Sequence, residues 1–211
     1  MASLEEKLLY EIEWRTDELS IIKTLPFLVN LSQQQKEIMR KYSIPTIYSL
    51  WEGFVVECFS IYARELSSLA LVRHQIHLNL LAHCLDMELG LNSPIMDFEK
   101  KKSTAKNLMV FMDSQIKIST KLPTDSNVNW NVINKILNRF NLKLLPENPF
   151  SKQLNKLLLI RNNIAHGQHT IPVDQIMIDE LSISVIGLMH EIFERISEGF
   201  KFKTYLEIVT L

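Results

Sequence analysis

The sequence predicts an all-α protein. Hydrophobic residues make up 46% of the chain, whereas only 5 of its 211 residues are glycine and 7 are proline. Apolar side chains are therefore abundant enough for a core, and residues that break helices are few. Over long stretches the apolar residues also recur every three or four positions, which is the spacing of one face of a helix. We expect one domain spanning residues 1–211.

The first half of the chain is predicted to hold three helices. Residues 3–23 form the first, and Pro26 is expected to close it because proline lacks the N–H that a helix interior needs. A second helix opens after the polar turn at residues 32–35, and Pro45 is expected to restart it as a first-turn proline. From Pro45 to about Leu71 apolar side chains lie nearly all round. We therefore expect this helix at the centre of the core or against a partner subunit.

The second half is predicted to hold four more helices. Their expected ranges are 72–89, 132–141, 150–166 and 172–199. Gly90 is expected to end the first of them, Pro172 to start the last and Gly199 to end it. We interpret residues 95–148 as an insertion of helix and loop within the same domain. The tail, residues 200–211, alternates weakly and is either a short strand or an arm.

The chain is nearly neutral, with a formal net charge of -1 and a pI near 6.6. Such a balance gives no general attraction to nucleic acid, so any contact with it has to be local. One candidate is the run Lys100-Lys101-Lys102. It is either a solvated face or a patch that contacts phosphate.

No segment points to a membrane or to an oxidising compartment. The first residues carry acids where a signal peptide needs a basic start, and no apolar run approaches the ~18 residues of a membrane span. Cys58 and Cys84 lie within apolar runs, as buried free thiols do in a reducing compartment. We expect a soluble cytoplasmic protein.

Three histidines and a cysteine gather in one short stretch, at His74, His77, His83 and Cys84. Their spacing fits none of the strong zinc signatures, and neither a CxxC pair nor an HExxH motif accompanies them. Solvated or packed histidines are the favoured interpretation. We predict neither a metal nor a cofactor.

The apolar helix over residues 150–166 ends in a dense polar cluster. Its members are Arg161, Asn162, Asn163 and His166, and Gly167 follows directly. On a regular helix Arg161 and His166 stand about 140° apart and share no face. If Gly167 is the left-handed residue of a C-terminal cap, His166 lies at the negative end of the helix dipole, which favours its protonated form. Asn162 could then orient the imidazole from one turn back.

This set of side chains suits RNA cleavage without a metal. A histidine can move protons to or from the 2′-hydroxyl or the leaving oxygen near neutral pH. The planar, charged guanidinium of an arginine can bind a phosphate and stabilise the charge that develops on it. A single Arg–His pair provides too few groups for both the acid and the base. Two copies that meet across a twofold axis would supply both, which predicts a homodimer.

The heptapeptide Arg161-Asn162-Asn163-Ile164-Ala165-His166-Gly167 resembles the R-N-x-x-A-H-G form of the Rx4–6H motif of the HEPN superfamily. Three further stretches resemble the branch of MAE-type HEPN-like nucleases. They are Glu13-Trp14-Arg15, Tyr48-Ser49-Leu50-Trp51-Glu52-Gly53-Phe54-Val55 and Ser126-Asn127-Val128. Together the stretches span roughly residues 5–200.

The resemblance implies a HEPN-like helical bundle and a metal-independent endoribonuclease of a toxin–antitoxin or phage-defence system. It implies that Arg161 and His166 are catalytic, that Asn162 is the polar residue beside the arginine, and that a dimer joins two motifs in one composite cleft. Glu52 is expected to face this cleft and pair with Arg161, and Asn163 to support the site. RNA is the expected substrate, and a cognate antitoxin protein is a candidate partner.

The chain departs from one related group of HEPN toxins. Those toxins carry a tyrosine two positions after the histidine, where a nucleotidyltransferase antitoxin modifies it. Gln168 stands at that position here. An antitoxin of that kind is therefore not expected.

Two other interpretations stay open. Arg161 and His166 can decorate a helix C-terminus for reasons of its dipole alone. A HEPN-like module can also bind RNA or a partner protein without cutting. The run Lys100–Lys102 and the exposed ends of the stripe from Tyr48 to Leu66 would then carry the function.

Overall fold

The all-α prediction is confirmed by the computed structural model, which describes residues 2–28, 30–89, 97–113, 116–124, 127–168 and 171–207. These residues contain seven α-helices and one short 3-10 helix, η1. The elements are α1 (Leu4–Leu28), α2 (Gln33–Ser68), η1 (Arg73–Gln75), α3 (Leu78–Leu89), α4 (Phe98–Asp113), α5 (Trp130–Arg139), α6 (Phe150–Ala165) and α7 (Gln175–Lys201). Gly90, Ser126 and the last four residues of the predicted tail lie outside the described residues.

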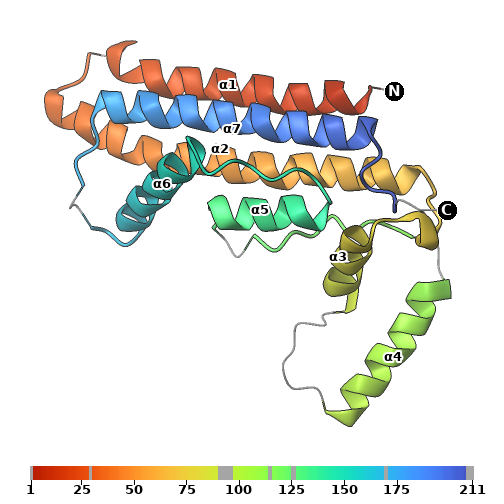
Figure 1. The fold of residues 1–211 in the computed structure, drawn as a ribbon. Helices are drawn as coiled ribbons and strands as arrows, with labels where there is room; N and C mark the ends of the chain where they lie inside the picture. Colours follow the sequence, from red (N-terminus) through yellow and green to blue (C-terminus); the bar gives the residue numbers. More distant parts are fainter. Residues whose placement is uncertain are drawn as a thin grey trace.

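Three long helices, α1, α2 and α7, lie side by side and form the body of the molecule (Figure 1). The shorter α6 packs against both α2 and α7, and α5 packs against α3 and α6. The C-terminal part of α6, which carries the polar cluster, meets the N-terminal half of α2, where Arg161 lies over Tyr48.

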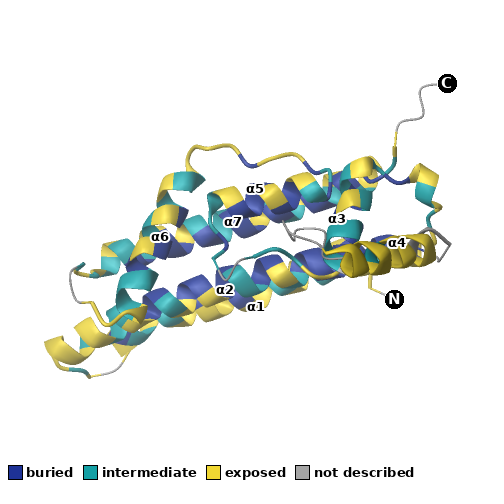
Figure 2. Cartoon of the chain, turned by 90° about the horizontal axis from the view of Figure 1, so that it is seen from below, coloured by how far each residue is buried: buried dark blue, intermediate teal, exposed yellow. Residues whose placement is uncertain are grey.

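The core is built around α2. The bulkiest side chains with almost no exposure are Trp51, Tyr48, Tyr62, Phe54, Phe59 and Phe140. All except Phe140 belong to α2, which packs against α1, α6 and α7 and is coloured as buried over much of its length in Figure 2. The sequence predicted this apolar helix either at the centre of the core or against a partner subunit. In the structure it lies at the centre of the core.

Two prolines do not act as predicted, because packing holds the helices together on both sides of them. α1 continues through Pro26 to Leu28, and α2 runs through Pro45 without a break. Around Pro45 the side-chain hydroxyls of Ser43, Thr46 and Ser49 donate to backbone carbonyls four residues earlier, at 2.9, 3.3 and 2.8 Å. Such bonds add polar partners inside the helix near the position where proline removes one N–H.

The limits predicted for the last helix are also wrong. α7 starts at Gln175, not Pro172, because Asp174 caps it: the Asp174 carboxylate accepts a hydrogen bond from the Met177 N–H at 2.8 Å. Gly199 is buried inside the helix instead of ending it. A Cβ on Gly199 would stand only 2.2 Å from the Leu142 Cδ2, so this glycine allows the close approach of another segment.

The stretch predicted as one helix over residues 72–89 is divided. It contains η1 and then α3, and between them Ile76 forms an isolated antiparallel bridge with Leu206. Two backbone hydrogen bonds join the same segments. The His77 N–H donates to the Tyr205 carbonyl at 2.8 Å, and the Glu207 N–H donates to the Gln75 carbonyl at 2.8 Å. The described part of the tail is thus an arm paired over a single bridge.

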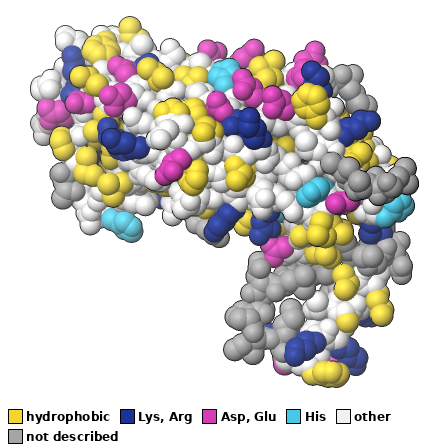
Figure 3. Space-filling model, viewed as in Figure 1, with side chains coloured by type: hydrophobic (Ala, Val, Ile, Leu, Met, Phe, Trp, Pro, Cys, Tyr) yellow, Lys and Arg dark blue, Asp and Glu magenta, His cyan; other side chains and the backbone are white. Residues whose placement is uncertain are grey.

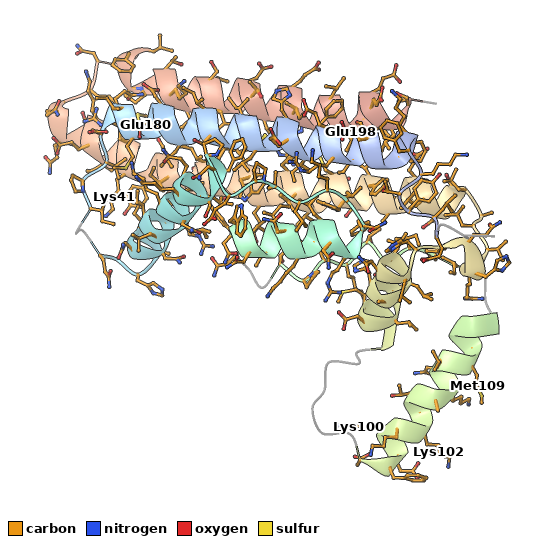
Figure 4. All side chains as sticks on the ribbon, viewed as in Figure 1. Lys41, Lys100, Lys102, Met109, Glu180 and Glu198 are labelled. Atoms are coloured by element: carbon orange, nitrogen blue, oxygen red, sulfur yellow. The ribbon has the colours of Figure 1, made fainter. Side chains whose placement is uncertain are left out.

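Residues 95–148 contain α4 and α5, which are placed very differently. Buried apolar residues of α5, such as Ile133, Ile136 and Leu137, join the core. α4 instead stands away from the three long helices, and its main packing partner is α3 (Figure 1). Basic and hydrophobic side chains, among them those of Lys100, Lys102 and Met109, lie on its open surface (Figures 3 and 4).

A matched pair of phenylalanines tests this division between core and projecting helix. Phe140 is fully buried, with ring centroids 5.0, 5.8 and 4.9 Å from those of Phe59, Tyr62 and His83. We expect Phe140→Ala to lower the free energy of unfolding by about 3–5 kcal/mol. Phe98→Ala on α4 should change it by less than about 0.5 kcal/mol, because Phe98 is 77% exposed. Urea unfolding of both variants measures the difference, and equal losses would contradict the fold.

Candidate active site

The polar cluster lies where α6 ends in a C-terminal cap of the kind predicted. Gly167 has a φ of 71°, in the left-handed region. The Gly167 N–H donates to the Ile164 carbonyl at 3.0 Å, and the Gln168 N–H donates to the Asn163 carbonyl at 2.8 Å. These two bonds form a Schellman motif, which satisfies the last carbonyls of the helix. The prediction for Gly167 is confirmed.

His166 is the residue at which the helical path stops. Its φ of -89° and ψ of 11° differ from those of a helix interior, while its N–H still donates to the Asn162 carbonyl at 3.0 Å. The side chain is exposed, at the negative end of the α6 dipole. An imidazole in this place can exchange protons with a bound molecule and with water.

Arg161 is held in place about one turn before the end of α6. Its guanidinium donates from Nη1 to the Asn162 side-chain oxygen at 3.0 Å and lies 4.8 Å from the centroid of the Tyr48 ring. The side chain is half-buried, because α2 covers one side of it. Asn163 donates from Nδ2 to the Leu159 carbonyl at 3.1 Å, so it supports the helix end.

Tyr48 is the residue that joins Arg161 to the rest of the fold. Its hydroxyl accepts a hydrogen bond from the Val128 N–H at 2.9 Å, and the Trp51 Nε1 donates to the Val128 carbonyl, also at 2.9 Å. Two side chains of α2 therefore satisfy both backbone groups of a buried residue that precedes α5. The ring of Tyr48 is then fixed as a platform for the guanidinium, a cation–π arrangement.

Glu52 lies one turn after Tyr48 and acts on it. The pKa of Tyr48 is raised to about 12, first by burial and further by the charge of Glu52 and its hydrogen bond to the hydroxyl. The bond from the Val128 N–H and the charge of Arg161 act in the opposite direction. Glu52 and Arg161 thus flank the same phenol. The expected ion pair between them does not form within the part of the chain that the structure describes.

The stretch Glu13-Trp14-Arg15 meets the other side of the same segment of α2. Arg15 is almost fully buried, donates to the Glu11 carbonyl at 2.9 Å and forms an ion pair with the Glu11 carboxylate. Its guanidinium lies 4.1 Å from the Trp14 ring centroid and 5.6 Å from that of Phe54. A buried, paired arginine of this kind anchors α1 on α2.

Sequence reasoning missed Tyr48 and Val128 as parts of the site. Tyr48 had a signal: it opens the segment that ends at Val55 and stands four residues before Glu52, the spacing of one helix face. Val128 had no such signal in the sequence, because it contributes only its backbone N–H and carbonyl to the site.

The histidines near residue 80 are solvated or packed, as favoured from their spacing. His83 is buried against Phe140, and its Nε2 lies 3.1 Å from the Ser119 carbonyl. Burial lowers the pKa of His83. Among the described residues, no three or more His, Cys, Asp or Glu side chains are grouped so that they could hold a metal ion.

Described residues of all four sequence stretches are thus connected through α2. The same combination of stretches agrees with a comparison against protein families. A family model described as MAE_28990-like HEPN matches residues 4–205, and the chain belongs to the HEPN family. Neither the curated proteins nor the solved structures compared with the chain gave a match.

Membership of this family has general consequences for function. HEPN domains are all-α bundles that are generally associated with ribonuclease activity, commonly bind RNA and commonly dimerise. None of the described helices combines the length and apolarity that a membrane span would need.

Removing the hydroxyl of Tyr48 should destabilise the fold. Tyr48→Phe leaves the Val128 N–H buried without its acceptor, so we expect a loss of about 1–3 kcal/mol in the free energy of unfolding. Tyr62→Phe is the matched control, because the Tyr62 hydroxyl is buried and has no hydrogen-bond partner among the described residues. Its removal should be neutral or stabilising. A larger loss for Tyr62→Phe in urea unfolding would argue against the bond to Val128.

The same tyrosine makes stability depend on alkaline pH. Burial raises the pKa of Tyr48 to about 12, whereas an unfolded tyrosine loses its proton near 10.0. Stability is therefore complete below about pH 10 and falls as pH rises toward 12, by up to about 1.4 kcal/mol per pH unit for this group. Tyr48→Phe should show a shallower fall, while Trp51→Phe, which removes the other bond to Val128 and no titratable group, should keep the wild-type slope. Equal slopes for the wild type and Tyr48→Phe would refute this assignment.

Proposed function

We propose that the protein is a metal-independent endoribonuclease whose reaction is carried by Arg161 and His166. One observation supports this most directly: Arg161 is fixed over Tyr48 at the same helix end where Gly167 turns the backbone and leaves His166 exposed. The fixed cation suits a phosphate, and the exposed imidazole suits proton transfer. Family membership supports RNA as the class of ligand.

The reaction is an internal transfer at phosphorus. The ribose 2′-oxygen forms a bond to the phosphorus while the bond to the departing 5′-oxygen breaks, leaving a 2′,3′-cyclic phosphate and a 5′-hydroxyl. His166 takes the proton of the 2′-hydroxyl or gives one to the 5′-oxygen. Arg161 stabilises the charge on the non-bridging oxygens. Asn162 holds one guanidinium N–H and so sets the direction of the others.

A second copy of the chain completes the site. One imidazole cannot be acid and base at once, so the two proton transfers need a His166 from each protomer. In a twofold dimer the same surface of both chains meets, and the two helix ends can face one phosphate. The exposure of His166, Gly167 and Gln168 in the single chain supports such a contact.

The biological role that we propose is that of a toxin in a toxin–antitoxin or phage-defence system. A nuclease of this class slows growth by removing cellular RNA. Expression of the wild type should therefore slow growth, whereas expression of Arg161→Ala to the same level should not. Equal growth of both strains would favour a HEPN module that binds RNA or protein without cutting. The open surface of α4, with Lys100 and Lys102, supports that second candidate.

Cleavage is tested with purified protein and total RNA in EDTA. We expect His166→Ala to lower the rate about 10²–10⁴-fold, the usual contribution of a general acid or base. Arg161→Ala should lower it about 10²–10³-fold, as loss of a donor to a developing oxyanion does. His190→Ala, which removes an exposed histidine of α7, is the matched control and should cut at the wild-type rate. Intact RNA with the wild type, or equal cutting by His166→Ala, would rule out this site.

The composite site is tested separately by the mass of the protein in solution. Light scattering at micromolar concentration should give a dimer for the wild type. A mixed dimer of wild-type and His166→Ala chains should also be about as impaired as His166→Ala itself, because the composite site needs both His166 side chains. A monomer that cleaves RNA would exclude the composite site and leave the assignment of Arg161 and His166 standing.

A further inference from the structure

A hollow of about 730 Å³ opens at the end of the bundle where α2 begins. Its main polar and aromatic lining comes from Arg40, Lys41 and Tyr42 of α2, and its opposite wall is the segment 171–174 that leads into α7. In Figure 4 Lys41 lies on the first turns of α2, at this end of the bundle. Hydrophobic and basic side chains lie next to each other at this end of the surface (Figure 3).

The hollow continues the proposed active site along α2. Lys41 and Tyr48 are seven residues apart, which places them within about 20° on the helix and about 10 Å apart along its axis. Arg161 lies over Tyr48 on this same face. The opposite wall begins at Ile171, five positions after His166. One wall of the hollow thus lies on the helix that carries Tyr48, and the other wall follows His166 in the sequence.

Its chemistry suits a nucleotide. The ring of Tyr42 is 57% exposed and lies 5.4 Å from the Lys41 Nζ. The Nε of Arg40 is buried, and no acceptor reaches it within the described part of the chain. The two acids of the lining are occupied: Asp174 caps α7, and Glu37 accepts a hydrogen bond from Gln33 at 3.0 Å. The lining thus combines an exposed tyrosine ring with two cations and two acids.

We propose that this hollow is a subsite of the same enzyme for a nucleotide two or three positions from the scissile phosphate. The base stacks on Tyr42, and the phosphate of that nucleotide binds Arg40 and Lys41. A stacked strand rises about 3.4 Å per nucleotide, so the subsite takes a residue two or three positions from a phosphate at Arg161. This inference rests on the proposed ribonuclease function. It adds a preference of the enzyme for a longer single-stranded RNA over a dinucleotide.

The chain offers a natural control hollow. A second hollow, of about 840 Å³, lies near the other ends of α1 and α2 and includes Tyr10, which is 63% exposed. Three acids, Glu6, Glu11 and Glu65, line it beside Lys7 and Arg64. It is similar in size and has an equally exposed tyrosine, but its charge disfavours phosphate and it is far along α2 from Arg161.

Binding is measured on full-length protein carrying His166→Ala, so that RNA stays intact. With a labelled single-stranded RNA of about ten nucleotides, Tyr42→Ala should weaken binding about 5- to 100-fold, the range for one base–aromatic stack, and Tyr42→Phe should restore it. Lys41→Ala should reduce the slope of log affinity against log salt by about 0.7. Tyr10→Ala should bind as the parent does. Equal binding by Tyr42→Ala and Tyr10→Ala, with both folded by circular dichroism, overturns the subsite.

Cleavage separates this inference from the function on which it rests. In the otherwise wild-type chain, Tyr42→Ala should reduce the preference for the longer RNA over a dinucleotide, and Tyr10→Ala should not. If RNA is cut and Tyr42→Ala keeps the full preference, the subsite is wrong and the nuclease stands. If RNA is not cut but its binding depends on Tyr42, the nuclease is wrong and the RNA subsite stands. If Tyr42→Ala instead abolishes dimerisation and leaves RNA binding intact, the hollow is a protein interface and the subsite is overturned.

Discussion

The two hydrogen bonds that hold the backbone of Val128 are the constraint on which the candidate site depends. Tyr48 accepts from its N–H and Trp51 donates to its carbonyl, both at 2.9 Å, so α2 fixes the segment that leads into α5. An unpaired buried amide costs more than a hydrogen bond gains, which makes this arrangement hard to distort. It also fixes the Tyr48 ring, and Arg161 lies on that ring. The backbone of Val128 thus helps to fix the ring on which the guanidinium lies.

α2 organises more than the core. Its C-terminal half buries Phe59 and Tyr62 against Phe140, its middle carries Tyr48 and Glu52, and its first turns carry Lys41 and Tyr42. Continuity through Pro45 keeps these three regions in one register. A break at that proline would uncouple the hollow from the residues around Arg161. In the proposed enzyme, the groups assigned to base stacking, phosphate binding and proton transfer therefore follow one helix on a chain whose net charge is only -1. For the proposed RNA substrate, local placement of these groups would replace the general attraction that a basic protein has for RNA.

The site also shows why a helix end suits this chemistry. The Schellman cap at Gly167 satisfies the last carbonyls of α6 and lets His166 leave the helical path without an unsatisfied backbone group. Arg161 remains inside the regular helix, where α2 and Asn162 hold it. One residue is rigid and the other is exposed, which matches the roles of binding a phosphate and exchanging protons. Each chain offers one such pair, so the proposed reaction needs two chains.

The sequence by itself determined what local chemistry and periodicity control. The helical spacing of apolar residues gave the all-α fold and the central place of the helix after Pro45, and a glycine after a polar cluster marked the cap at Gly167. The four similar stretches marked the family. Only the tertiary structure decided that Pro26 and Pro45 lie inside helices, that Gly199 allows a close approach, and that Tyr48 connects Glu52, Val128 and Arg161. These features depend on contacts between segments up to about a hundred residues apart in sequence, where packing and the pairing of buried backbone groups outweigh local propensity.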